Sequence, residues 1–394
     1  LALRIVAGTA GMLGAQSLLD IASAHIDGCL YHGPAGVLFA ERLAALGGRV
    51  LVPATLNVGA LDLLHARRTR LPPEAVALAR RQMDAYEALG CRPSWTCAPY
   101  QAGHRPGFGE DVAWGESNAV AFCNSVLGAR TERYGDFLDI CAALTGRAPR
   151  TGLHLAENRF ATILIDASVL GAALCAEDAL YPVLGAWLGR RVGSAIAAID
   201  GLPRALAEDR LKALGAAAAA TGSVGLFHII GVTPEAPDRA TAFDGAPPIE
   251  VIRLTPAMLD AERDALSTGP AGAIDAVAIG SPHLSPGECR ALLAHLDGRR
   301  VAVPFYACTS RHVVAALAGD AVALERAGVT LVADTCIVVT PILAASGGVL
   351  LTNSAKFAHY VPSLTGWAVR FGSLGECVES AVAGRLIADP VLWR

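Results

Sequence analysis

The last third of the chain alternates short apolar strands with amphipathic helices, and this alternation limits the fold more than any other feature. The expected strands DAVAIG, VAVPFYACTSR and VTLVADTCIVV run into the polar groups SPH, CTSR and DTC. Strands that alternate with helices form parallel sheets, and the carboxyl ends of parallel strands lie at one edge of the sheet. The sequence therefore predicts an α/β fold in which residues 281–283, 308–311 and 334–336 line a single cleft.

The same alternation continues through the rest of the chain, and 394 residues exceed what one hydrophobic core usually serves. An Ala- and Gly-rich middle region contains the helix LAEDRLKALGAAAAA and then the strand SVGLFHIIGV, in which His228 is expected to be a core histidine. We therefore expect two or three α/β domains. In the first region the pattern predicts helices over 34–46, 72–89 and 136–144, a helical run within 16–28, and the strand RVLVP.

Composition excludes several classes of function. The net charge is only −4 and no basic run occurs, so we expect no nucleic-acid or membrane partner. No apolar stretch reaches the roughly 18 residues of a spanning helix, and residues 1–15 lack the charged start of a signal peptide. The chain has no GxGxxG after a strand, no P-loop and no GxSxG elbow. We expect a soluble, cytoplasmic protein without the usual signals of nucleotide, phosphoryl or serine-hydrolase chemistry.

Ten cysteines are scattered along the chain without any CxxC pair, so most should be packed, reduced thiols. Cys97 lies in the polar stretch 94–133 and is either a small buried thiol or a thiol that faces a cleft. If Cys97 approaches Cys308 and Cys336, three thiolates face one point, which suits an iron–sulfur cluster or zinc. A cluster with three protein thiolates keeps an iron site open for a substrate hydroxyl.

Other polar residues leave alternatives open. His25 beside Asp27 could be a ligand, an oriented acid or base, or a structural pair. Thr55 and Asn57 follow an expected strand, where they either present polar groups or only form the turn. Lys356 is a candidate to bind a substrate carboxylate or to form a surface salt bridge.

Eight ordered segments, spread over almost the full length, resemble the signature blocks of the aconitase X family. They are SAHIDGCLYHG, VLVPATLN, TCAPY, WGESNAVAFCNSVLGART, LFHIIGVTPEA, FYACTSR, ADTCIVV and TNSAKFAHY. The resemblance implies an aconitase-like fold of three α/β domains with largely parallel sheets around a central cleft. We place them at 1–165, 166–270 and 271–394. The resemblance also implies an iron–sulfur cluster held by Cys97, Cys308 and Cys336, and an activity that dehydrates a small hydroxy acid.

The family divides by substrate. Bacterial members resemble cis-3-hydroxy-L-proline dehydratases, and archaeal members resemble phosphomevalonate dehydratases. The Ala, Gly and Arg bias favours the hydroxyproline branch, whose product is Δ1-pyrroline-2-carboxylate. Ser281 also favours this branch, because it stands where some relatives are expected to have Cys. The loss of a potential thiolate at this position leaves the cluster type open among 2Fe-2S, 3Fe-4S and 4Fe-4S. An alternative of another class is a metal-binding subunit without catalysis.

The resemblance suggests roles for the remaining polar residues. The family also uses a small swivelling domain, and no block of this sequence resembles it, so we expect a small partner subunit that could carry a serine-type base. We expect catalytic roles for His25, Glu116, Ser117 and Lys356, and substrate contacts from Thr55, Asn57, Asn118, Arg130 and Ser281.

Overall fold

The largest sheet lies in the last third of the chain and is entirely parallel, with the strand order β12-β11-β10-β13-β14. The structure, a computed structural model, describes residues 1–65, 68–344 and 346–389. Because β10, β11 and β12 are parallel neighbours, their carboxyl ends share one edge, as predicted. The strands are β10 (Ala276–Leu284), β11 (Phe305–Thr309), β12 (Val329–Ala333), β13 (Val349–Thr352) and β14 (Ala368–Phe371).

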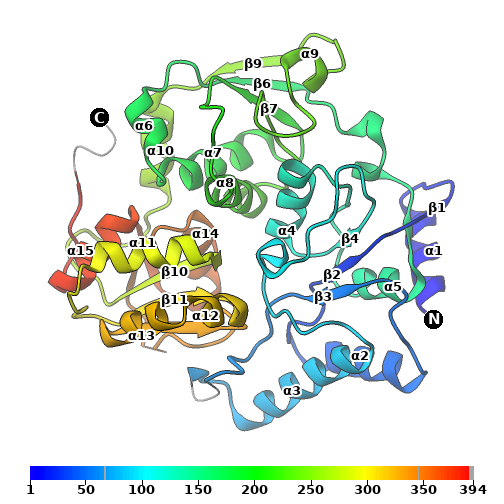
Figure 1. The fold of residues 1–394 in the computed structure, drawn as a ribbon, viewed down its shortest axis with the longest axis horizontal. Coiled ribbons are helices and arrows are strands. Elements are labelled where there is room, and N and C mark those ends of the chain that lie inside the picture. The colour runs from blue at the N-terminus through cyan, green and yellow to red at the C-terminus, as the bar shows by residue number, and fades with distance from the viewer. Residues whose placement is uncertain (66–67, 345, 390–394) are drawn as a thin grey trace.

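Helices cover both faces of this sheet (Figure 1). Helix α11 begins with a capping box in which the side chains of Ser285 and Glu288 accept each other's backbone N–H groups. This local signal explains why its start could be predicted from the sequence. The helices are α11 (Pro286–Leu296), α12 (Arg311–Leu317), α13 (Gly319–Arg326), α14 (Ala355–Thr365) and α15 (Leu374–Ala383).

The middle region forms a second parallel sheet in the order β8-β7-β6-β9. Its Ala- and Gly-rich composition allows α7 and α8 to pack closely, because a Cβ on Gly185 would meet the Leu214 backbone oxygen at 2.2 Å. Its elements are β6 (Ile163–Asp166), α6 (Ala172–Ala176), α7 (Leu180–Val192), β7 (Ala197–Asp200), α8 (Glu208–Thr221), β8 (His228–Ile229), α9 (Arg239–Ala242), β9 (Glu250–Arg253) and α10 (Pro256–Ala265).

The first region contains a parallel sheet in the order β3-β2-β4 and an antiparallel pair, β1 with β5. The predicted helices appear as α2, α3 and α5, and α4 begins inside the polar stretch. The elements are α1 (Ala2–Met12), β1 (Leu18–Asp20), β2 (Ala24–Ile26), α2 (Pro34–Ala45), β3 (Ala54–Leu56), α3 (Pro73–Ala88), β4 (Ala113–Trp114), α4 (Ser117–Phe122), α5 (Leu138–Thr145) and β5 (Arg147–Pro149).

Two sequence expectations in this region are wrong. The helical run within 16–28 is instead the strands β1 and β2, because pairing with β5, β3 and β4 overrides local helix propensity. The strand RVLVP is also absent: β3 begins at Ala54, directly after Pro53, which has no backbone N–H to donate to a sheet. Leu51 is 71% exposed, so this segment runs along the surface.

Helix α8 lies at the centre of the molecule, where it packs on α7, α4 and α14 (Figure 1). It therefore contacts elements of all three regions. His228 in β8 is buried and bonds to the Arg159 carbonyl oxygen, which confirms it as a core histidine. None of the helices in the described ranges has the length and apolar character that crossing a bilayer requires.

Candidate functional site

A cavity of about 410 Å³ opens where the strand ends of the first and third regions meet. Its wall combines polar groups with an apolar side formed by Val338, Val339 and Leu364. It contains seven of the residues predicted for the site, drawn from segments far apart in the chain. They are Asn57, Cys97, Glu116, Ser117, Ser281, Cys336 and Lys356.

Two of the three predicted thiols, Cys97 and Cys336, lie on this wall, and Cys308 is buried beside them at the end of β11. Burial raises the pKa of the Cys97 thiol to about 12, and the charge of Glu116 adds to this effect. Burial also raises the pKa values of Cys308 and Cys336. The Cys308 thiol interacts electrostatically with the thiols of Cys336 and Cys97, and the latter two line the same cavity.

The three predicted thiols are soft donors, the type of ligand that holds iron–sulfur clusters. Within the described residues, no group of three His, Cys, Asp or Glu side chains is arranged to hold one ion. A cluster spreads its ligands over several irons, so its thiolates do not need to converge on one atom. All ten cysteines, which lie within the described ranges, are free thiols.

Lys356 and Glu116 form the main ion pair of the cavity. Glu116 is the N-cap of α4: its Oε2 accepts the backbone N–H of Ala119 at 2.7 Å. The Lys356 ammonium donates to Glu116 Oε1 and to Ser117 Oγ. Burial opposes the charge of Lys356, but the carboxylate of Glu116 outweighs this and raises the Lys356 pKa above its ordinary value. The cavity therefore contains a permanent cation.

Asp27 lines the opposite part of the wall and accepts a hydrogen bond from the Asn57 amide. Its own backbone N–H donates to Asp139 Oδ2 at 2.5 Å. Burial, together with the charges of Glu116, Asp136 and Asp139, raises the pKa of Asp27 to about 8. At neutral pH Asp27 is therefore mostly a neutral acid that can donate a proton.

Besides Cys308, four predicted site residues lie off the cavity wall: His25, Thr55, Asn118 and Arg130. His25 Nδ1 bonds to Thr55 Oγ1 at 2.8 Å, and Thr55 bonds to His104 at 2.7 Å. Burial lowers the pKa of His25 well below its usual range, so the ring is neutral and belongs to a structural network between β2 and β3.

The side-chain amide of Asn118 donates a hydrogen bond to the backbone carbonyl oxygen of Cys97 at 3.0 Å. Asn118 therefore contacts the backbone beside the thiol and not the cavity. Arg130 lies beside the Glu110–Val112 segment, where its backbone bonds to both of those residues. The fold therefore does not bring Arg130 to the cavity.

The sequence interpretation missed a role for His283, which is fully buried in β10. Its backbone N–H donates to Cys97 Sγ at 3.3 Å. The available signal was its place in the polar SPH group at the end of the expected strand. Asp27 was considered only as a partner of His25, although its surroundings are carboxylates and an amide.

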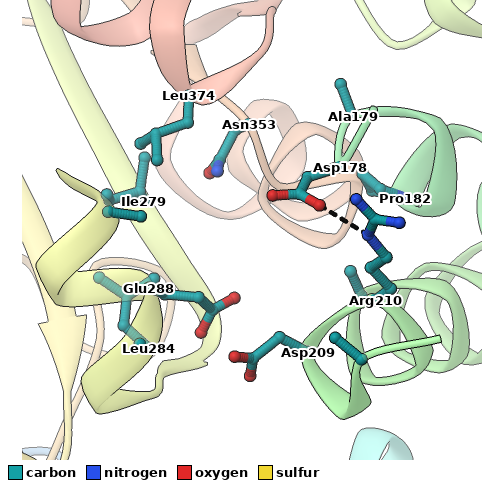
Figure 2. A pocket seen from close by; sticks show the side chains of 14 residues that line it. Asp178, Ala179, Pro182, Asp209, Arg210, Ile279, Leu284, Glu288, Asn353 and Leu374 are labelled. Atoms are coloured by element: carbon teal, nitrogen blue, oxygen red, sulfur yellow. Dashed lines mark hydrogen bonds and ion pairs between the residues drawn. The ribbon is translucent and has the colours of Figure 1, made fainter. Parts of the chain in front are cut away.

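A second cavity, of about 210 Å³, lies between α7, α8 and α11 (Figure 2). Asp178 and Arg210 form an ion pair at its edge, as Figure 2 shows. Lys212 bonds to the other two carboxylates, Asp209 and Glu288. These charges are already paired, and no thiol lines this cavity. The thiol-lined cavity is therefore the candidate site.

Comparisons with known proteins identify the family and the fold. Family models described as Aconitase X first, second and third domain match residues 1–157, 161–264 and 274–383. A crystal structure of Thermococcus kodakaraensis aconitase X in its holo-form superposes with a TM-score of 0.85. That chain is 32% identical, and the match covers 96% of this chain and 94% of the other.

Curated relatives have two kinds of name. A cis-3-hydroxy-L-proline dehydratase of Pseudomonas aeruginosa is 48% identical over 405 residues, which span 100% of this chain and 68% of the relative. A cis-3-hydroxy-L-proline dehydratase of Hypocrea jecorina is 42% identical, and the match covers 97% of this chain and 65% of that relative. A phosphomevalonate dehydratase large subunit of Methanothermobacter thermautotrophicus is 36% identical over 92% of this chain and 90% of its own. The chain therefore spans about two thirds of the first two relatives.

Proposed function

The chain belongs to the aconitase X family, and we propose that it is the cluster-binding part of a hydro-lyase that dehydrates cis-3-hydroxy-L-proline to Δ1-pyrroline-2-carboxylate. The relatives at 48% and 42% identity have this activity in their names. The observation that carries the proposal is the gathering of Cys97, Cys308 and Cys336 at a cavity with an internal Lys356–Glu116 pair.

In this proposal Cys97, Cys308 and Cys336 hold an iron–sulfur cluster. When bound, such a cluster supplies a Lewis-acidic iron without a protein ligand, suited to a substrate hydroxyl. The support on this chain is a set of three buried soft donors, two of which line the cavity.

Lys356 and Glu116 provide one positive and one negative group, which can bind the carboxylate and the ammonium of an amino-acid substrate. The Lys356 ammonium and the Ser117 hydroxyl face the cavity together and bind the substrate carboxylate. The Glu116 carboxylate lies next to them and attracts the ring ammonium. Val338 and Val339 provide an apolar surface for the ring carbons.

Asp27 supplies a proton in this scheme. The Asn57 amide orients the Asp27 carboxyl, and the acid form donates its proton to the C3 hydroxyl as the C–O bond breaks. The Cα proton passes to a base, and the electron pair of the Cα–H bond forms the new double bond. Water leaves, and the enamine tautomerises to the cyclic imine product. We place the serine-type base on the small partner rather than on His25, because His25 does not line the cavity.

Phosphomevalonate fits the cavity less well. A phosphate monoester carries close to two negative charges and is normally bound by several cations or by free N–H groups at a helix start. Lys356 is already paired with Glu116, and the same Glu116 carboxylate occupies the N-terminus of α4. A non-catalytic metal-binding subunit is also disfavoured, because the relatives of both branches are named dehydratases.

The proposal includes a small swivel-domain partner and a cytoplasmic location. Relatives of the second branch are named large subunits, which supports a small swivel-domain partner. The first two relatives extend beyond the matched region, so this partner could also be fused to the chain. Ten free thiols are consistent with the reducing cytoplasm.

An anaerobic assay tests the function. The full chain is reconstituted with iron and sulfide, combined with the small domain, and supplied with cis-3-hydroxy-L-proline or phosphomevalonate. We expect imine formation from the hydroxyproline only. Preferential turnover of phosphomevalonate would overturn the substrate assignment, and a protein that takes up zinc but no iron or sulfide would overturn the cluster.

A further inference from the structure

His283 is fully buried, and all four of its hydrogen-bonding groups have partners. Its backbone N–H donates to Cys97 Sγ at 3.3 Å, and its backbone oxygen accepts from Lys212 Nζ at 3.3 Å. Its ring bonds to Thr96 Oγ1 at 3.0 Å and to the Thr335 carbonyl oxygen at 3.1 Å. The residue therefore connects the first, middle and third regions.

The partners determine which ring nitrogen carries the proton. The Thr335 carbonyl can only accept, so His283 Nε2 is the donor. In a neutral ring Nδ1 is then an acceptor, and the Thr96 hydroxyl donates to it. The same Thr96 oxygen accepts the backbone N–H of Ala98 at 3.1 Å, which closes the turn around Cys97.

The two ring partners directly precede two of the three thiols in the chain. Thr96 precedes Cys97, and Thr335 precedes Cys336. Those thiols come from loops 239 positions apart, 336 minus 97, and no local pattern sets their separation. One rigid ring with a donor on one side and an acceptor on the other holds both loops at a defined distance.

We propose that His283 is a positioning residue that holds Cys97 and Cys336 in the geometry needed to receive the cluster. The inference rests on the proposed cluster ligands, but the positioning can be measured on the metal-free chain. Lys212 contributes from the middle region, because its buried ammonium, paired with Glu288, fixes the His283 carbonyl group.

The test uses the metal-free full chain and a matched control. His228 is also a buried histidine, 2% exposed, and its ring bonds to one backbone oxygen away from the thiols. H283L and H228L each remove one buried ring. H283Q restores one donor and one acceptor. The measurement is the rate of iodoacetamide modification of each cysteine, followed by mass mapping of peptides.

In H283L we expect modification of Cys97 and Cys336 to accelerate about tenfold, as the loss of two buried hydrogen bonds predicts for local opening. Cys141 and Cys377 should keep their wild-type rates, H228L should leave Cys97 and Cys336 unchanged, and H283Q should fall near the wild type. After reconstitution, the visible circular dichroism spectrum of H283L should differ from that of the wild type and of H228L.

Two results would overturn the inference: unchanged rates for Cys97 and Cys336 in H283L, or an equal acceleration of all cysteines, which reports general loosening. Failure of the wild-type chain to take up any cluster would instead refute the proposed function, and the modification rates would still report the positioning of the thiols.

Discussion

Lys356 Nζ is bonded to Glu116 Oε1 although the two residues stand 240 positions apart in the chain. The bond joins the first turn of α14, in the third region, to the N-cap of α4, in the first. Both side chains are largely buried, at 12% and 7% exposure. The pair therefore links the first and third regions at the cavity wall and places both charges there.

Removing one member of this pair should destabilise the protein and abolish activity. Lys356→Met leaves the Glu116 carboxylate unpaired in a buried place, which we expect to cost about 3 kcal/mol of unfolding free energy. Glu116→Gln in addition should recover most of that stability, because the amide oxygen can still cap α4. Turnover should remain about 100-fold reduced in the double variant, because substrate positioning is lost. Denaturant unfolding measures the free energy of unfolding, and the imine assay measures turnover. A double variant with wild-type turnover would contradict the assigned role.

Substitution should distinguish the three proposed ligand cysteines from the other buried cysteines by their effect on cluster uptake. Cys308→Ala is expected to abolish iron and sulfide uptake, because it removes a proposed ligand. Cys377→Ala is the matched control, since Cys377 is equally buried but lies in α15. Both lose a similar buried volume, so similar unfolding free energies are expected. Iron and sulfide analysis after reconstitution decides the matter: equal cluster content in the two variants would remove Cys308 from the ligand set.

Asp27 should make the protein less stable as the pH rises. Its pKa is raised from 3.8 to about 8, so the folded state keeps a proton that the unfolded chain has released. Stability from this group is therefore complete below pH 4 and is lost progressively towards pH 8. Asp27→Asn keeps an acceptor for Asn57 and removes the ionisation, so its melting temperature should vary less over this range. Turnover should fall by about 100-fold or more. The exposed Asp20→Asn is the control, and a variant with the wild-type pH slope would refute the assignment.

Gly280 should be intolerant of any side chain. Its φ is +98°, and a Cβ there would meet the Cys308 backbone oxygen at 2.1 Å. Gly280→Ala therefore forces β10 away from β11 at the thiols, and we expect at least about 2 kcal/mol of destabilisation together with reduced cluster uptake. Gly272→Ala is matched in backbone strain, with a φ of +106°, but has open space. It should cost about 1 kcal/mol and leave cluster uptake unchanged. Equal effects of both substitutions would show that the contact with Cys308 is unimportant.

Local patterns account for what could be predicted. The capping box at Ser285 and Glu288 marks the start of α11, and Pro73 begins α3. Strand and helix alternation correctly indicated that the ends of β10, β11 and β12 share an edge. The same approach failed at RVLVP, where apolar periodicity suggested a strand but Pro53 cannot donate to a ladder.

By itself, the sequence determined the α/β class, the parallel edge that carries Cys308, and the family to which the chain belongs. The first two follow from side-chain direction and backbone hydrogen bonding over a few residues, which periodicity records. The family follows from the resemblance of eight ordered segments. Only the tertiary structure decided that Cys97 and Cys336 line one cavity, that Lys356 pairs with Glu116, and that burial raises the pKa of Asp27. It also decided that His25 bonds to Thr55 away from the cavity wall. The reason is that burial and the neighbouring charges of distant segments exist only after the chain has packed.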